Sequence, residues 1–67
     1  MSIENIIFED TDSKKETAIK TALIYVGTSE LTNQLAKIGV THTKVIKGAK
    51  TKYILRSKDF ERTEVVL

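Results

Sequence analysis

Residues 29–57 read SELTNQLAKIGVTHTKVIKGAKTKYILRS, and this stretch decides the fold. Its first part places Leu31, Leu35 and Ile38 at intervals of four and three, which is typical of one face of a helix. Gly39 follows, and glycine readily takes the left-handed conformation that ends many helices. From residue 41 onwards we interpret the sequence with a period of two, in which successive side chains point to opposite faces of a strand. The stretch therefore predicts a helix over residues 29–38 and a β-hairpin over residues 41–57 that turns near Gly48.

A second helix is predicted upstream, over residues 14–26. Ser13 and Glu16 have the spacing of a capping box, which marks a helix start. The apolar residues that follow recur at helical intervals, and Gly27 is placed to end the helix. Before it, residues 3–9 (IENIIFE) are rich in β-branched side chains and predict a first strand. Residues 63–67 (TEVVL) predict a short terminal strand.

These elements predict one α+β domain that spans residues 1–67, in the order β-α-α-β-β-β. The order is a strand, two short helices, a basic β-hairpin and a short terminal strand. One arrangement that satisfies the pattern places both helices on one face of a small antiparallel sheet. The predicted core consists of apolar residues on the inward faces of these elements: Ile6, Phe8, Ile19, Leu23, Val26, Leu31, Leu35, Ile38, Val45, Tyr53 and Leu55.

A chain of 67 residues can build only a small core, so it needs additional stabilisation. The chain has no cysteine for disulfides, and its single histidine, His42, cannot form a metal site alone. We therefore expect no metal and no cofactor. We expect a homodimer, in which a partner copy covers the apolar residues 65–67. No secretory signal or membrane-spanning segment is visible, so the expected location is the cytoplasm.

No catalytic motif is recognisable, and we expect the protein not to be an enzyme. His42 lies between Thr41 and Thr43, but adjacent residues on a strand point to opposite faces, so it cannot activate either hydroxyl. The acidic residues near Asp12 lack the spacing of a calcium-binding loop, because a lysine occupies the third ligand position and no glycine follows. These residues are better explained as a solvated turn before a helix.

Charge is distributed unevenly along the chain. Residues 1–33 carry three lysines against six acidic residues, whereas residues 34–67 carry eight basic residues against three acidic ones. A basic hairpin beside a polar helix face is a surface that suits a polyanion. The alternative is that these lysines are only the solvated side chains of a hairpin. The candidate nucleic-acid-binding residues are Thr32, Asn33, Gln34, Lys37, Lys44, Lys47, Lys50, Lys52 and Arg56.

The order strand, helix, short turn, helix and basic hairpin resembles the winged helix-turn-helix DNA-binding domains. The residues that carry the resemblance are Leu31 and Leu35, then Gly39 and Val40, then KGAKTKYIL at residues 47–55. It covers about residues 6–56, and the helix that precedes the first strand in that family is missing. The resemblance implies a winged-helix-like fold in which the helix residues read the DNA groove. It also implies that Lys47, Lys50 and Lys52 contact phosphates.

The expected function is that of a small, basic-faced nucleic-acid-binding protein. It would bind DNA, most simply duplex DNA, and act in transcription regulation through the second helix and the lysine-rich hairpin. The alternative is a small non-enzymatic protein-binding module, an inhibitor or adaptor of viral or bacterial type, which docks on an acidic protein surface. Salt distinguishes the two, because binding to DNA weakens steeply as salt rises.

Overall fold

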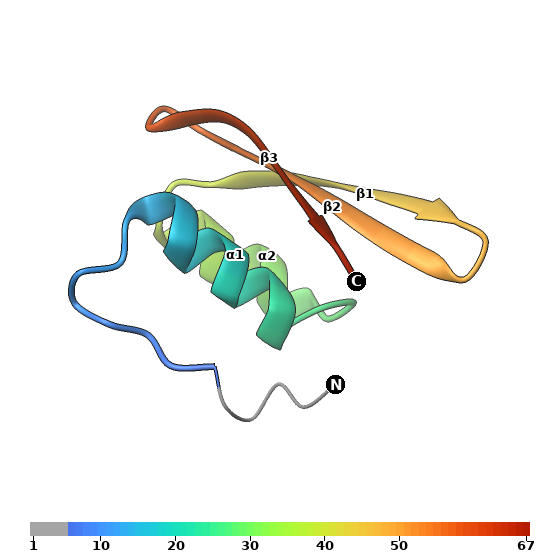
Figure 1. The fold of residues 1–67 in the computed structure, drawn as a ribbon, viewed down its shortest axis with the longest axis horizontal. Coiled ribbons are helices and arrows are strands. Elements are labelled where there is room, and N and C mark those ends of the chain that lie inside the picture. Colours follow the sequence, from blue (N-terminus) through green and yellow to red (C-terminus); the bar gives the residue numbers. More distant parts are fainter. Residues whose placement is uncertain (1–5) are drawn as a thin grey trace.

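The computed structural model describes residues 6–67 and contains two helices and a three-stranded sheet. The elements are α1 (Lys14–Ile24), α2 (Ser29–Lys37), β1 (Thr41–Lys47), β2 (Lys50–Ser57) and β3 (Phe60–Val66). The strands are antiparallel in the order β1-β2-β3, and both helices lie on the same side of the sheet (Figure 1). The predicted α+β class is confirmed, with two helices followed by a hairpin and a terminal strand.

Helix α1 begins at the predicted capping box. The Ser13 hydroxyl oxygen accepts a hydrogen bond from the Glu16 backbone N–H at 3.2 Å, and it also lies 3.1 Å from a Glu16 carboxylate oxygen. The helix ends at Ile24, two residues earlier than the sequence predicts. Its buried side chains are small and include Ala18 and Ala22. Small side chains at the interface allow the helix backbone to approach the rest of the core closely.

Helix α2 ends at Lys37 through a Schellman motif, as its glycine indicates. Gly39 has a φ of 72°. Its N–H donates to the Ala36 carbonyl at 3.1 Å, and the Val40 N–H donates to the Leu35 carbonyl at 2.9 Å. This is the pair of hydrogen bonds that defines the motif. Val40 and Leu35 are both buried, so the chain leaves the helix and enters β1 through the core.

The β1–β2 hairpin has a two-residue turn at Gly48 and Ala49, because Lys47 pairs directly with Lys50. Gly48 has a φ of 59°, whereas Ala49 does not have a positive φ. A positive followed by a negative φ is the sign pattern of a type II′ turn, which favours glycine at its first central position. The lysines on either side of the turn are therefore held in a fixed register.

The β2–β3 connection contains a bulge and is tied to α1. Ser57 pairs with Phe60 and Leu55 pairs with Thr63, so β3 has one extra residue opposite β2 in this interval. The turn that joins the strands is held against the start of α1 by an ion pair between Lys14 and Asp59 at 2.8 Å.

The core lies between the helices and one face of the sheet. Tyr53 is 1% exposed, and its hydroxyl accepts a hydrogen bond from the Gly27 N–H at 2.8 Å. This bond joins β2 to the loop between the helices. Ile19, Leu23 and Ile38 are half-buried and pack against the core, as predicted. The fully buried apolar residues are Ala18, Ala22, Leu31, Leu35, Val40, Tyr53, Leu55 and Val65.

Four of the predicted core residues are not buried in this core. Phe8 is 47% exposed and Val26 is 38% exposed, while Ile6 is half-buried and precedes α1. Val26 lies beyond the end of the helix, so it loses the position that the helical spacing implied. Val45 is half-buried but pairs with Lys52, which places it on the sheet face opposite to Tyr53.

The predicted first strand is wrong where the structure describes it. Residues 6–9 do not form a strand, and residues 3–5 lie outside the described residues. The reason is a contact with α1, because the Ile7 carbonyl accepts a hydrogen bond from the Lys20 ammonium group at 2.8 Å. A turn follows, in which the Asp12 N–H donates to the Glu9 carbonyl at 3.1 Å. The segment is thus fastened to α1 and not to a neighbouring strand.

Thr63 carries a buried hydroxyl that has no hydrogen-bond partner among residues 6–67, and the residue is 8% exposed. Thr63→Val is expected to raise the free energy of unfolding by about 1 kcal/mol, because it removes an unsatisfied polar atom and keeps the shape. Urea unfolding measures this. Thr43→Val on the exposed side of β1 is the control and should change stability by less than about 0.5 kcal/mol. A destabilised Thr63→Val variant would contradict the prediction.

Within residues 6–67, neither helix has the length and apolar character needed to cross a membrane.

Candidate nucleic-acid interface

The sheet has one face covered by helices and one face without helices, which we call the open face (Figure 1). Paired residues of an antiparallel sheet lie on the same face, and alternate residues lie on opposite faces. Tyr53 and Leu55 are in the core, so the residues between them along β2, and the partners of those residues, lie on the open face. The open face therefore carries Thr41, Thr43, Val45, Lys47, Lys50, Lys52, Ile54, Arg56, Glu64 and Val66.

Three lysines of the open face meet at the end of the hairpin. They surround a shallow hollow of ≈ 170 Å³ whose lining residues are Val45, Lys47, Lys50, Lys52 and Val66. The two valines supply an apolar surface, and the lysines supply positive charge around it. The fixed register of the hairpin turn brings these five side chains together from all three strands.

Lys47 and Lys50 occupy directly opposite positions on β1 and β2. Like charges in such a pair destabilise a sheet by a few tenths of a kcal/mol. Within the described part of the chain, neither lysine forms an ion pair that would offset this repulsion. The tip of the hairpin is therefore a site of uncompensated positive charge.

Lys52 differs from the two tip lysines, because it is paired with Glu64. Its ammonium group lies 3.2 Å from a Glu64 carboxylate oxygen, and Arg62 lies 2.9 Å from the same oxygen. Hydrogen bonds from Lys52 and Arg62 hold the pKa of Glu64 below its usual value. The positive charge of the open face is thus concentrated at Lys47 and Lys50, and Arg56 is exposed farther along β2.

The predicted site residues fall on two sides of the sheet. Leu31 and Leu35 bury α2 against the helix-covered face, so the exposed α2 residues lie on that side. Gln34 donates a side-chain hydrogen bond to the Glu30 carboxylate. Lys44 pairs with Tyr53 and is also on the helix-covered side. The open face holds Lys47, Lys50, Lys52 and Arg56; the other side holds Thr32, Asn33, Gln34, Lys37 and Lys44.

The sequence interpretation missed the apolar part of the hollow. The sequence pattern predicts Val45 in the core, and it indicates Val66 only as part of an apolar chain end. The pattern contained the necessary signal, since a turn at residues 48–49 places positions 45, 47, 50 and 52 on one face. Arg62 was also missed, because the residues before the terminal strand gave no clear periodicity.

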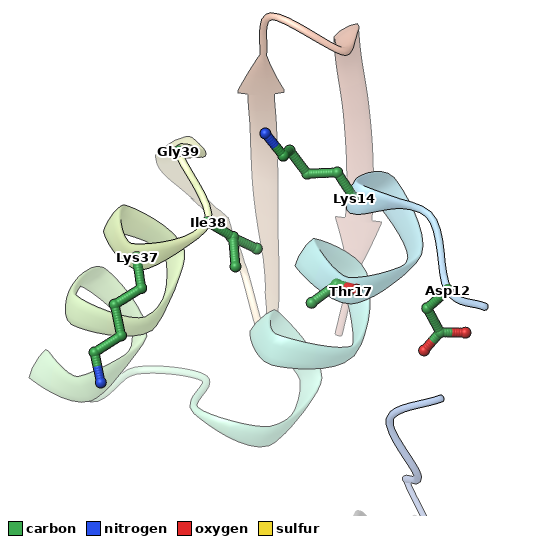
Figure 2. Close-up of a pocket in the computed structure, with 6 residues that line it drawn as sticks. All are labelled: Asp12, Lys14, Thr17, Lys37, Ile38 and Gly39. Atoms are coloured by element: carbon green, nitrogen blue, oxygen red, sulfur yellow. The ribbon is translucent and has the colours of Figure 1, made fainter. Parts of the chain in front are cut away.

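A larger cavity of ≈ 450 Å³ lies where the start of α1 meets the end of α2 (Figure 2). Figure 2 shows the charged side chains of Asp12, Lys14 and Lys37 directed away from one another. Lys14 is paired with Asp59, and Asp12 is paired with Lys20 at 2.7 Å. The Lys20 hydrogen bond lowers the pKa of Asp12, and the pKa of Lys20 is raised in return. Asp12 and Lys14 are thus engaged in ion pairs that stabilise the fold, and the charged side chains do not converge on a ligand.

Among the described residues, no group of three or more histidine, aspartate or glutamate side chains is arranged to hold a metal ion. Comparison with known protein families, curated proteins and solved structures gives no significant match for this chain. The functional argument therefore depends on the geometry and charge of the chain itself.

Proposed function

We propose that the protein binds duplex DNA through the open face of its sheet and acts as a regulatory protein in the cytoplasm. The observation that carries the proposal is the convergence of Lys47, Lys50 and Lys52 around one hollow at the hairpin tip. A phosphate backbone neutralised by lysines releases its condensed counterions, and this release favours binding. The proposal keeps one element of the winged-helix resemblance, namely a basic hairpin that contacts phosphates.

The shape of the hairpin supports a duplex as the partner. Its tip extends beyond the helices as a two-stranded ribbon (Figure 1). A ribbon of this kind can span the major groove of B-DNA, which is about 12 Å wide, with its lysines against the phosphates at the groove edge. The bulk of the helices lies on the other side of the sheet, so it does not block the approach of a long, stiff duplex to the open face.

The aromatic residues support a duplex over a single strand. Proteins that bind single strands commonly stack bases on exposed aromatic side chains. Here Tyr53 is buried beneath the helices, and Tyr25 and Phe60 pack against the core. Phe8 lies in the segment before α1. The open face offers lysines and aliphatic side chains, which match a phosphate backbone better than unstacked bases.

The test is a salt titration of the wild-type protein with a fluorescently labelled duplex, followed by anisotropy. With three or four phosphate contacts, the logarithm of the affinity should fall against the logarithm of the salt concentration with a slope of about −3 between roughly 50 and 200 mM. An absence of binding at the low end of this range, or a slope near zero, would overturn the proposal.

A second candidate function, a protein-binding module, is supported by apolar residues near the same tip. Ile46, Val66 and Leu67 are exposed, although Val65, grouped with the last two in the sequence interpretation, is buried in the core. Exposed apolar side chains among lysines suit an acidic protein surface. The homodimer stays a prediction, and Val66 and Leu67 are the residues that a second copy would cover. Binding to an acidic protein that persists in high salt would favour this function.

A further inference from the structure

We infer that the open face binds the sugar–phosphate backbone of a duplex without reading its sequence. This inference depends on the proposed function and specifies the kind of recognition that the site can perform. It departs from the expectation that the residues of α2 read the bases. Three features of the structure carry it: the chemistry of the tip, the position of α2, and the engagement of the other polar side chains.

The chemistry of the tip favours phosphates over base edges. Lysine presents a compact charge on a flexible stem, whereas the planar fork of arginine or the amide of asparagine and glutamine gives bidentate contacts to bases. The hollow at the tip is lined by Lys47, Lys50 and Lys52 around two valines, and the ammonium group of Lys52 is shared with Glu64. A phosphate can lie among the ammonium groups while its deoxyribose packs in the apolar part of the hollow.

The side chains that are able to read bases lie elsewhere or are already engaged. Asn33 is on α2, and the sheet separates it from a duplex on the open face. Gln34 is hydrogen-bonded to Glu30, and Arg62 is paired with Glu64. Among the groups on the open face, Arg56 is the exception, because its guanidinium forms no ion pair within residues 6–67.

Arg56 is far from the two tip lysines, Lys47 and Lys50. It is six residues from Lys50 along β2, and a strand rises by about 3.3 Å per residue, so the two are about 20 Å apart. At that distance one arginine can add a further phosphate contact at the other end of the same face. A single guanidinium is able to form a bidentate contact with guanine, so the experiment tests Arg56 directly.

The experiment measures the affinity of the wild-type protein at the same low salt for three duplexes of equal length: all A·T, all G·C, and a mixed duplex recovered by repeated selection of the tightest binders from a randomised pool. We expect affinities within about threefold of one another, whereas sequence-specific proteins favour their sites by 10³-fold or more. Two variants test the side chains that could otherwise read bases, those of α2 and that of Arg56. Asn33→Ala with Gln34→Ala removes the amides of α2, and Arg56→Lys keeps the charge but removes the fork. Neither variant should change the affinities by more than about threefold.

The outcomes separate this inference from the proposed function. A preference above tenfold for one duplex overturns the inference, and its loss in either variant identifies the residue that reads the base. Weak or absent binding to all three duplexes overturns the proposed function, and the inference with it. Equal binding to all three duplexes, unchanged in both variants, supports the inference.

Discussion

Replacing both tip lysines with glutamate, Lys47→Glu with Lys50→Glu, is expected to reduce the affinity for duplex DNA by a hundredfold or more at about 50 mM salt. Each substitution removes a phosphate contact and adds a repulsive charge. The slope of log affinity against log salt should also become shallower by about one unit for each lost contact. The fold should persist, because two directly opposed glutamates repel each other about as strongly as the two lysines do.

The matched control is Lys15→Glu with Lys58→Glu. Both lysines are exposed, Lys15 in the first turn of α1 and Lys58 in the β2–β3 turn. The control makes the same change in net charge, but away from the hairpin tip. If both double variants lose affinity equally, the effect is one of overall charge, and the assignment of the interface to the tip is wrong. Lys52 is left unchanged because glutamate there would face Glu64.

Leu35→Ala is expected to leave the protein largely unfolded at room temperature. Leu35 has 0% exposure and belongs to the core formed by α1, α2 and the sheet. Truncating a fully buried leucine costs about 2–5 kcal/mol. A chain of this length has a total stability of roughly 3–10 kcal/mol, so the loss removes much or all of it. Circular dichroism during thermal unfolding measures the effect.

Thr32→Ala is the control for this prediction, since Thr32 lies on the exposed side of the same helix. It should change the stability by less than about 0.5 kcal/mol. If Leu35→Ala retained the melting temperature of the wild-type protein, α2 would not be the helix that closes the core, and the arrangement of the two layers would need revision.

The parts of the fold that could be predicted from the sequence are those with strong local signals. Ser13 and Glu16 gave the start of α1, and Gly39 gave the end of α2. Gly48 gave the position of the hairpin turn. In each case the local backbone needs a capping side chain or a positive φ, which few residue types provide. Such positions can therefore be recognised without knowledge of the tertiary structure.

The parts that could not be predicted depend on contacts between distant residues. The apolar segment at Ile7 has the composition of a strand, but its carbonyl is hydrogen-bonded to Lys20 of α1. Val45 fits a core position by hydropathy, but the register of the hairpin places it opposite Lys52, and only the exact position of the turn indicates this from the sequence. The separation of the predicted site residues onto two sides of the sheet also depends on contacts between distant residues. Which face of the sheet the helices cover depends on packing, and no local pattern in residues 41–57 specifies it.

The order of the elements has a consequence for the folding pathway. Apart from the contacts that α1 makes with β2 and β3, every element packs against its neighbour along the chain. Such local contacts have a low loop-closure cost and form early. α1 also packs against β3, and the ion pair between Lys14 and Asp59 links the start of α1 to the turn before β3. Because this contact connects the first helix to the last strand, we expect the helix pair and the two hairpins to unfold together as one cooperative unit.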